Sequence, residues 1–136
     1  MNIKHKTLLM LFSCFVCFAT IGSMAFAIED ASPTYALATV TLNSNLVASC
    51  NAETRTDCNE IYISSMYLQR VNSSGTSVYS SIRIDPPSTT ASGTDTFFVT
   101  HNCSEAASAG NYYRVKVTFW ADGEEKTDYS NVVYFD

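Results

Sequence analysis

His101 is the residue in this 136-residue chain that is best suited to acid–base chemistry. The other histidine, His5, lies in an N-terminal segment that we expect to be removed. A serine triad, or a nucleophile at Cys50 or Cys103, would therefore depend on His101 as its base. No serine lies in a nucleophile elbow, the glycine-flanked turn that presents a catalytic serine. We interpret His101 as a surface residue near a strand end and predict that the protein is not an enzyme, with a His/Cys-dependent hydrolase as the less favoured alternative.

Three cysteines follow that N-terminal segment: Cys50, Cys58 and Cys103. In an exported chain the expected chemistry is a disulfide, and an odd count leaves one thiol over. Cys50 and Cys58 are closest in sequence, whereas Cys50 and Cys103 would tie two strands together, and the third pairing is also open. A zinc site is disfavoured because there is no C-x-x-C spacing. We predict one disulfide and leave its pairing undecided.

Carboxylates gather at two places in the predicted turns. Asp57 and Glu60 flank Cys58, and Glu124 and Glu125 lie beside a hairpin tip. A glycosidase needs two acids across a cleft, and a calcium loop of the D-x-D-x-D-G type is absent from the sequence. We interpret these side chains as solvated loop charges and predict neither a metal nor a cofactor.

One predicted strand carries a more suggestive set of side chains. If its apolar residues face inward, alternate positions place a row of aromatic and basic side chains outward: Tyr112, Arg114, Lys116, Thr118 and Trp120. Aromatic faces together with a guanidinium are typical of surfaces that bind carbohydrate or peptide. Aromatic side chains on an exposed strand can equally serve only to cover neighbouring strands. We take Tyr112, Arg114, Lys116 and Trp120 as the candidate binding residues.

The first residues have the organisation of a secretory signal peptide. A short basic stretch at Lys4–Lys6 precedes an apolar run from Leu8 to about Ile21, and Ala25–Ala27 fits a small-x-small cleavage site. The apolar run is too short for a comfortable membrane span. We predict a signal peptide over residues 1–27 and one secreted domain over residues 28–136, with no membrane anchor after cleavage.

The charge of the predicted mature chain excludes some partners. Removing residues 1–27 takes away Lys4 and Lys6 but no acid, so the formal net charge falls from −5 to −7. The remaining lysines and arginines are scattered along the sequence rather than clustered. An acidic domain without a basic stripe is a poor partner for nucleic acid. We expect no nucleic-acid binding and a monomer.

Alternation of apolar and polar residues predicts an all-β chain with few helix signals. The segments with period two are residues 36–42, 46–54, 60–71, 77–84, 95–101, 112–120 and 128–135. About seven short strands separated by turn residues predict an antiparallel two-sheet sandwich. A phase change at Ser64–Ser65 predicts a β-bulge, and Asp122-Gly123 predicts a tight hairpin turn.

Parity predicts which side chains form the core. Along residues 112–120 the inward set is Tyr113, Val115, Val117 and Phe119. Leu46, Ala48, Cys50 and Ala52 share one side of an earlier strand. In the last predicted strand, either Val132 and Tyr134 or Val133 and Phe135 face inward, and the sequence does not decide between them.

Three stretches resemble a family of small secreted proteins from Gram-positive anaerobic bacteria whose activity is uncharacterised. They are YLQRVNSSG (Tyr67–Gly75), GNYYRVKVTF (Gly110–Phe119) and DYSNVVYF (Asp128–Phe135). The resemblance implies an immunoglobulin- or fibronectin-like β-sandwich and says almost nothing about activity. This chain lacks the tryptophan expected after SSG, and Cys58 and Cys103 look like additions.

Export, one rigid domain and the lack of an assembled catalytic group lead to one functional prediction. We expect a secreted, non-enzymatic binding module that recognises an extracellular glycan or protein through an exposed sheet face. The alternative is a structural or assembly subunit in which an exposed edge strand pairs with a neighbour.

Overall fold

A computed structural model describes residues 34–136. The predicted signal peptide and residues 28–33 of the predicted domain lie outside these residues. The strands are β1 (Tyr35–Leu42), β2 (Val47–Cys58), β3 (Ile61–Val71), β4 (Val78–Ile84), β5 (Thr90–Ala91), β6 (Thr94–Asn102), β7 (Asn111–Ala121), β8 (Glu124–Tyr129) and β9 (Val133–Phe135). One short 3-10 turn, η1 (Ser104–Ala106), follows β6.

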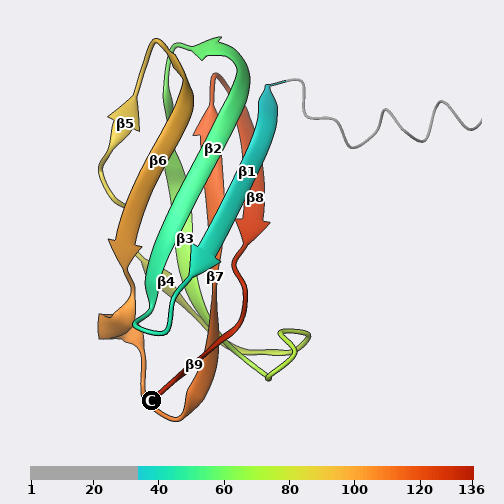
Figure 1. The fold of residues 1–136 in the computed structure, drawn as a ribbon, viewed down its shortest axis with the longest axis vertical. Helices are drawn as coiled ribbons and strands as arrows, with labels where there is room; N and C mark the ends of the chain where they lie inside the picture. Colours follow the sequence, from blue (N-terminus) through green and yellow to red (C-terminus); the bar gives the residue numbers. More distant parts are fainter. Residues whose placement is uncertain (1–33) are drawn as a thin grey trace, which may run out of the picture. The chain divides into compact units, whose positions relative to one another are not determined.

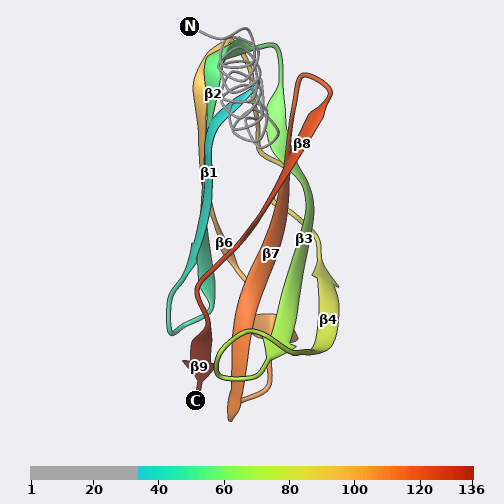
Figure 2. The same cartoon turned by 90° about the vertical axis from the view of Figure 1, so that its right-hand side faces the viewer.

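The strands form two antiparallel sheets. The three-stranded sheet has the order β1-β2-β6, and the six-stranded sheet has the order β4-β3-β7-β8, with β5 also paired to β3 and β9 to β7. The two sheets lie face to face as two layers (Figures 1 and 2). The predicted antiparallel two-sheet sandwich is confirmed. Residues 34–136 form nine strands rather than about seven, because a short β5 forms between the predicted strands 77–84 and 95–101 and the last predicted strand is divided in two.

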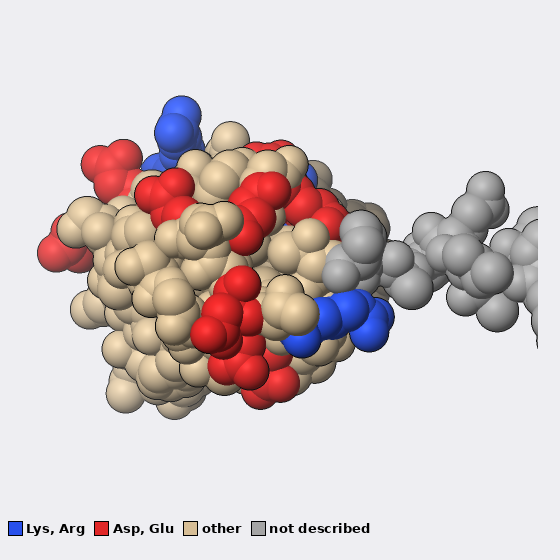
Figure 3. Space-filling view, turned by 90° about the horizontal axis from the view of Figure 1, so that it is seen from above, with Lys and Arg blue, Asp and Glu red and all other residues tan. Residues whose placement is uncertain are grey.

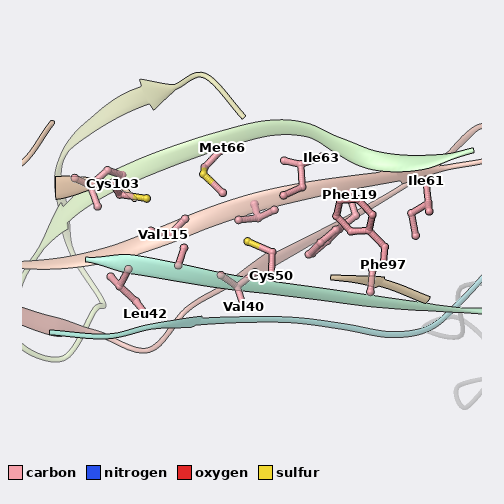
Figure 4. Packing of buried hydrophobic residues seen from close by; sticks show 14 of the residues in the cluster. Val40, Leu42, Cys50, Ile61, Ile63, Met66, Phe97, Cys103, Val115 and Phe119 are labelled. Carbon is pink, nitrogen blue, oxygen red and sulfur yellow. The ribbon is translucent and has the colours of Figure 1, made fainter. Parts of the chain in front are cut away.

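The core lies between the two sheets and follows the predicted parity. Tyr113, Val115, Val117 and Phe119 of β7 are all buried, as are Leu46, Ala48, Cys50 and Ala52. Phe97 of β6 meets Phe119 edge to face with ring centroids 6.5 Å apart, so an aromatic contact crosses between the layers. Figure 4 shows how side chains from both sheets interdigitate in this core.

The predicted irregularities of the strands occur where expected. The β3–β7 register shifts between Ile63 and Ser65, which is the predicted bulge. Asp122 and Gly123 have φ values of 46° and 91°, so both adopt the left-handed conformation of a two-residue type I′ hairpin turn. This turn sets the register in which Ala121 faces Glu124.

The last predicted strand, residues 128–135, is not continuous. β8 ends at Tyr129 and β9 begins at Val133. Ser130 replaces the missing ladder bonds, because its N–H donates to the Val115 oxygen (2.9 Å) and its Oγ accepts the Val115 N–H (2.8 Å). In β9, Val133 and Phe135 pack against the core and Tyr134 is 45 % exposed. The odd-numbered pair therefore faces inward.

The break between β8 and β9 brings side chains to the free edge of β1. The Asp128 carboxylate accepts the Val40 N–H (2.9 Å). The Asn131 amide accepts the Leu42 N–H (2.9 Å) and donates to the Leu42 oxygen (2.9 Å). Figure 2 shows the chain crossing toward β1 after β8. Side chains, rather than another strand, thus close this lateral edge of the sandwich.

No helix among residues 34–136 has the length and apolar character needed to cross a membrane.

Candidate functional site

The four predicted binding residues lie on the outer face of the six-stranded sheet. In the β3–β7 register Trp120 is opposite Tyr62, Lys116 is opposite Tyr67 and Arg114 is opposite Gln69. Opposite residues in an antiparallel pair project from the same face. Tyr129 of β8 is opposite Lys116, and Tyr134 of β9 is opposite Tyr112. We call this surface the outer face; it consists of Tyr62, Tyr67, Tyr112, Arg114, Lys116, Trp120, Tyr129 and Tyr134.

Two aromatic pairs stand at the two ends of the outer face. Trp120 stacks on Tyr62 with ring centroids 5.1 Å apart and an interplanar angle of 26°. Tyr112 lies against Tyr134 with centroids 5.0 Å apart and an angle of 56°. Trp120 follows Tyr112 by eight positions along β7, which corresponds to about 27 Å along an extended strand. Because each ring is packed on a partner, the rings are held in place before any ligand arrives.

Between these pairs, Arg114 is fixed by neighbouring groups. Its Nε donates to the Gln69 Oε1 (2.8 Å) and its Nη1 donates to the Gly75 oxygen (3.0 Å). Its guanidinium carbon lies 4.6 Å from the centroid of the Tyr129 ring. Arg114 therefore joins the β3–β4 loop to the sheet, and only part of its donor capacity remains for a ligand.

Lys116 and Thr118 differ in how accessible they are. The Lys116 Nζ lies 5.9 Å from the centroid of the Tyr129 ring, and the side chain is half-buried. Thr118 is only 8 % exposed, and its hydroxyl is 3.0 Å from that of Thr127. Parity assigned Thr118 correctly to the outer side, but neighbouring side chains cover it, so it does not contribute to the accessible surface.

Tyr62, Tyr67, Tyr129 and Tyr134 extend the outer face beyond the residues predicted from the sequence. The predicted residues all belong to one strand, whereas the face is built from four strands. The register of β3, β8 and β9 against β7 was the missing information. The Asp122-Gly123 turn is sufficient to predict the register of β8 against β7, because a two-residue turn places Glu125 opposite Trp120 and Tyr129 opposite Lys116.

The predicted disulfide does not form: Cys50, Cys58 and Cys103 are free, buried thiols. A disulfide needs Cα atoms about 4.4–6.8 Å apart. Cys50 lies opposite Val99 of β6, and the Cys103 N–H donates to the Leu46 oxygen four positions farther along the pair of strands. About 13 Å of strand therefore separates the two cysteines. Cys50 and Cys58 are both on β2, eight positions and about 27 Å apart. Figure 4 shows Cys50 in the middle of the core and Cys103 toward one end of it.

Burial makes Cys50 and Cys103 poor nucleophiles. Desolvation raises the pKa of Cys50 to about 12 and that of Cys103 to about 11. Both stay protonated at neutral pH, and the thiolate is the reactive form. The Cys103 Sγ donates to the main-chain oxygen of His101 (3.8 Å), so this contact does not involve the imidazole ring.

His101 lies at a hollow of about 580 Å³ where the ends of β4 and β6 meet. Its lining combines two basic with two acidic side chains and the buried Cys103: Arg83, Ile84, Asp85, Thr100, His101, Asn102, Cys103, Glu105 and Ala106. No serine belongs to this lining. The hollow therefore brings His101 and Cys103 together but offers no activated nucleophile.

Two carboxylates of the turns, those of Asp122 and Glu124, hold backbone groups. Asp122 accepts the N–H groups of Asn59 (3.0 Å) and Glu60 (3.2 Å), which fixes the β2–β3 turn beside the β7–β8 turn. The Glu124 carboxylate accepts the Thr34 N–H (3.2 Å). Figure 3 looks onto the end of the sandwich with these turns and shows acidic side chains in several separate patches. Residues 34–136 contain no group of three or more histidine, cysteine or carboxylate side chains placed to hold a metal.

Comparison with known proteins adds no relative: no family model, curated protein or solved structure is significantly similar to this chain. The resemblance to secreted proteins of Gram-positive anaerobes stays a prediction, as does the immunoglobulin- or fibronectin-like classification of the sandwich.

Proposed function

We propose that this protein is a secreted, non-enzymatic binding module that takes an extracellular glycan or protein on its outer face, and that a glycan is the better fit. The observation that carries the proposal is the pair of fixed aromatic contacts, Tyr62–Trp120 and Tyr112–Tyr134, at the two ends of β7. Between them lie Arg114 and Lys116 above the ring of Tyr129.

The chemistry of the outer face supports a sugar chain as ligand. The apolar C–H surface of a pyranose ring can lie on an aromatic face, and hydroxyl groups accept hydrogen bonds from guanidinium, ammonium and indole N–H groups. A platform about 27 Å long suits an extended ligand that runs along the strand. Because the rings are already packed in pairs, binding costs little side-chain entropy.

The test is a glycan array followed by calorimetry on the best glycan. Trp120→Ala removes one ring pair and Tyr112→Ala removes the other, and we expect each to lower affinity about tenfold or more, equivalent to about 1.4 kcal/mol. The matched control is Phe98→Ala, because Phe98 is 66 % exposed but lies on the three-stranded sheet. Arg114→Ala is a poor probe because Arg114 also holds the loop at Gly75.

Thermal denaturation must first show that Trp120→Ala and Tyr112→Ala keep the fold. Undiminished binding by the Trp120→Ala, Tyr112→Ala double variant would refute the outer face as the site. Capture of proteins but of no glycan on parallel arrays, with the same dependence on these rings, would keep the site and change the ligand class.

A further inference from the structure

The two lateral edges of the sandwich are built differently. At one edge, Asp128 and Asn131 bond to the outward groups of β1. At the other edge lie β6 of the three-stranded sheet and β4 of the six-stranded sheet. β1 packs against β8 and β7, and β2 packs against β7, whereas β3 is the only strand among residues 34–136 with which β4 makes an extensive contact. β6 is the last strand of its layer.

Apolar side chains of β4 that face the other sheet are incompletely covered. Ile82 is in register with Leu68, and Ile84 with Met66, so both project inward with these fully buried neighbours. Ile82 is nevertheless 42 % exposed, and Ile84 is half-buried. An inward-facing isoleucine with this exposure indicates an incomplete layer above it.

The backbone of β6 offers hydrogen-bonding groups at the open edge. The Cys103 N–H donates to Leu46 of the β2 side (2.9 Å). In an antiparallel ladder, one residue directs both its N–H and its C=O toward one side of the strand, and the next residue directs both toward the other side. Cys103 bonds toward β2, so the backbone groups that point away from β2, to the open edge, are those of Phe98, Thr100 and Asn102.

Part of this edge is already occupied by a local contact. The Thr96 N–H, which has the same parity, donates to the Thr94 hydroxyl (3.2 Å). The open stretch thus runs from Phe98 to Asn102, and the hollow of about 580 Å³ adjoins its end at Thr100–Cys103. β6 contains neither proline nor lysine, the residues that commonly protect an edge strand.

We propose that the open edge of β6 accepts an extended segment of a partner protein as the fourth strand of the three-stranded sheet. The segment would pair its backbone with Phe98–Asn102. Its inward side chains would lie over Ile82 and Ile84, so they must be apolar at alternate positions. Its outward side chains would lie beside Phe98, which is 66 % exposed.

This inference is independent of the proposed glycan site. Phe98–Asn102 lie on the three-stranded sheet, and Ile82 and Ile84 face inward from β4, whereas the outer face is the opposite face of the six-stranded sheet. The sequence left edge pairing as an alternative without saying which edge is involved. The structure distinguishes the two edges, because side chains of Asp128 and Asn131 bond to the outward backbone groups of β1, whereas β6 is the edge strand on the other side.

The probe is a blocked nine-residue peptide in which valine and threonine alternate between terminal lysines. We expect saturable binding with Kd of about 1 mM or tighter, measured by NMR titration at neutral pH, with shifts at Phe98–Asn102, Ile82 and Ile84. Thr100→Pro removes one outward N–H without removing a bond to β2, and Phe98→Lys adds a charge at the edge. Each should weaken binding at least tenfold.

Two controls separate strand pairing from nonspecific adhesion. Leu37→Lys introduces the same charge on the capped strand β1, where Leu37 is 41 % exposed, and should leave binding unchanged. A peptide N-methylated at every second residue on its pairing edge should not bind. Equal binding of this peptide, or no binding of the parent peptide at 1 mM, would overturn the proposal. Dimerisation of the protein alone that Thr100→Pro abolishes would overturn it in favour of a second copy as the occupant.

Discussion

Replacing Asn131 with alanine should measurably destabilise the sandwich although the residue is exposed. Its amide makes two hydrogen bonds to Leu42, each 2.9 Å long. Leu42 is 4 % exposed, so its main-chain groups at the edge would lose these partners in a poorly hydrated place. A hydrogen bond contributes about 0.5–1.5 kcal/mol net, so Asn131→Ala should cost about 1–3 kcal/mol. For a domain of this size each kcal/mol lowers Tm by about 4–8 °C.

Thermal and urea denaturation, followed by circular dichroism, measure this loss. Asn131→Asp keeps an acceptor for the Leu42 N–H but removes the donor to the Leu42 oxygen, so it should be intermediate. Thr41→Ala, an exposed substitution on the same strand, is the matched control and should change the free energy of unfolding by less than about 0.5 kcal/mol. If Asn131→Ala costs no more than Thr41→Ala, side-chain capping of β1 is not a source of stability.

Burial of two thiols predicts a loss of stability at high pH. The folded-state pKa values of Cys50 and Cys103, about 12 and 11, lie above the ordinary value of 9.0, so their contribution to folding stability is complete below pH 9 and is lost as pH rises toward 11–12. The urea concentration at the unfolding midpoint should fall over this pH range, and less steeply in Cys50→Ala. A thiol reagent at pH 8 should react with these cysteines only after unfolding. Gly75→Ala should destabilise more than Gly123→Ala, because both have positive φ but only at Gly75 would the new Cβ meet a neighbour, Val132, at 2.8 Å. The Gly75→Ala, Val132→Ala double variant should recover part of the difference in urea denaturation, and no recovery would contradict the steric explanation.

Local patterns were sufficient to predict much of the fold. Period two along residues 112–120 identified the buried side chains of β7, because β7 has a core on one side only. The Asp122-Gly123 pair predicted its turn because a type I′ turn needs two residues that tolerate positive φ. These features depend on neighbours in sequence, and so the sequence carries them.

Other features depend on contacts between distant segments. Nothing local shows that Asp128 bonds to Val40, a residue 88 positions away. The cysteines were expected to pair because of their presumed compartment, but pairing requires close Cα atoms, which the register of β2 and β6 denies. The outer face was underestimated for the same reason, since Tyr62 and Tyr134 reach it through strand pairing.

The segment from Asp128 to Asn131 explains why β8 and β9 are separate strands. Tyr129 projects outward beneath Arg114, while Asp128 projects toward Val40. To reach Leu42, the chain must leave β7 at Asn131, which would deprive Val115 of its ladder partner. The Ser130 hydroxyl and N–H replace that partner, so no backbone group of Val115 is left unpaired. One tetrapeptide thus supports the outer face and closes the β1 edge, which leaves the edge at β6 as the side of the sandwich open to another strand.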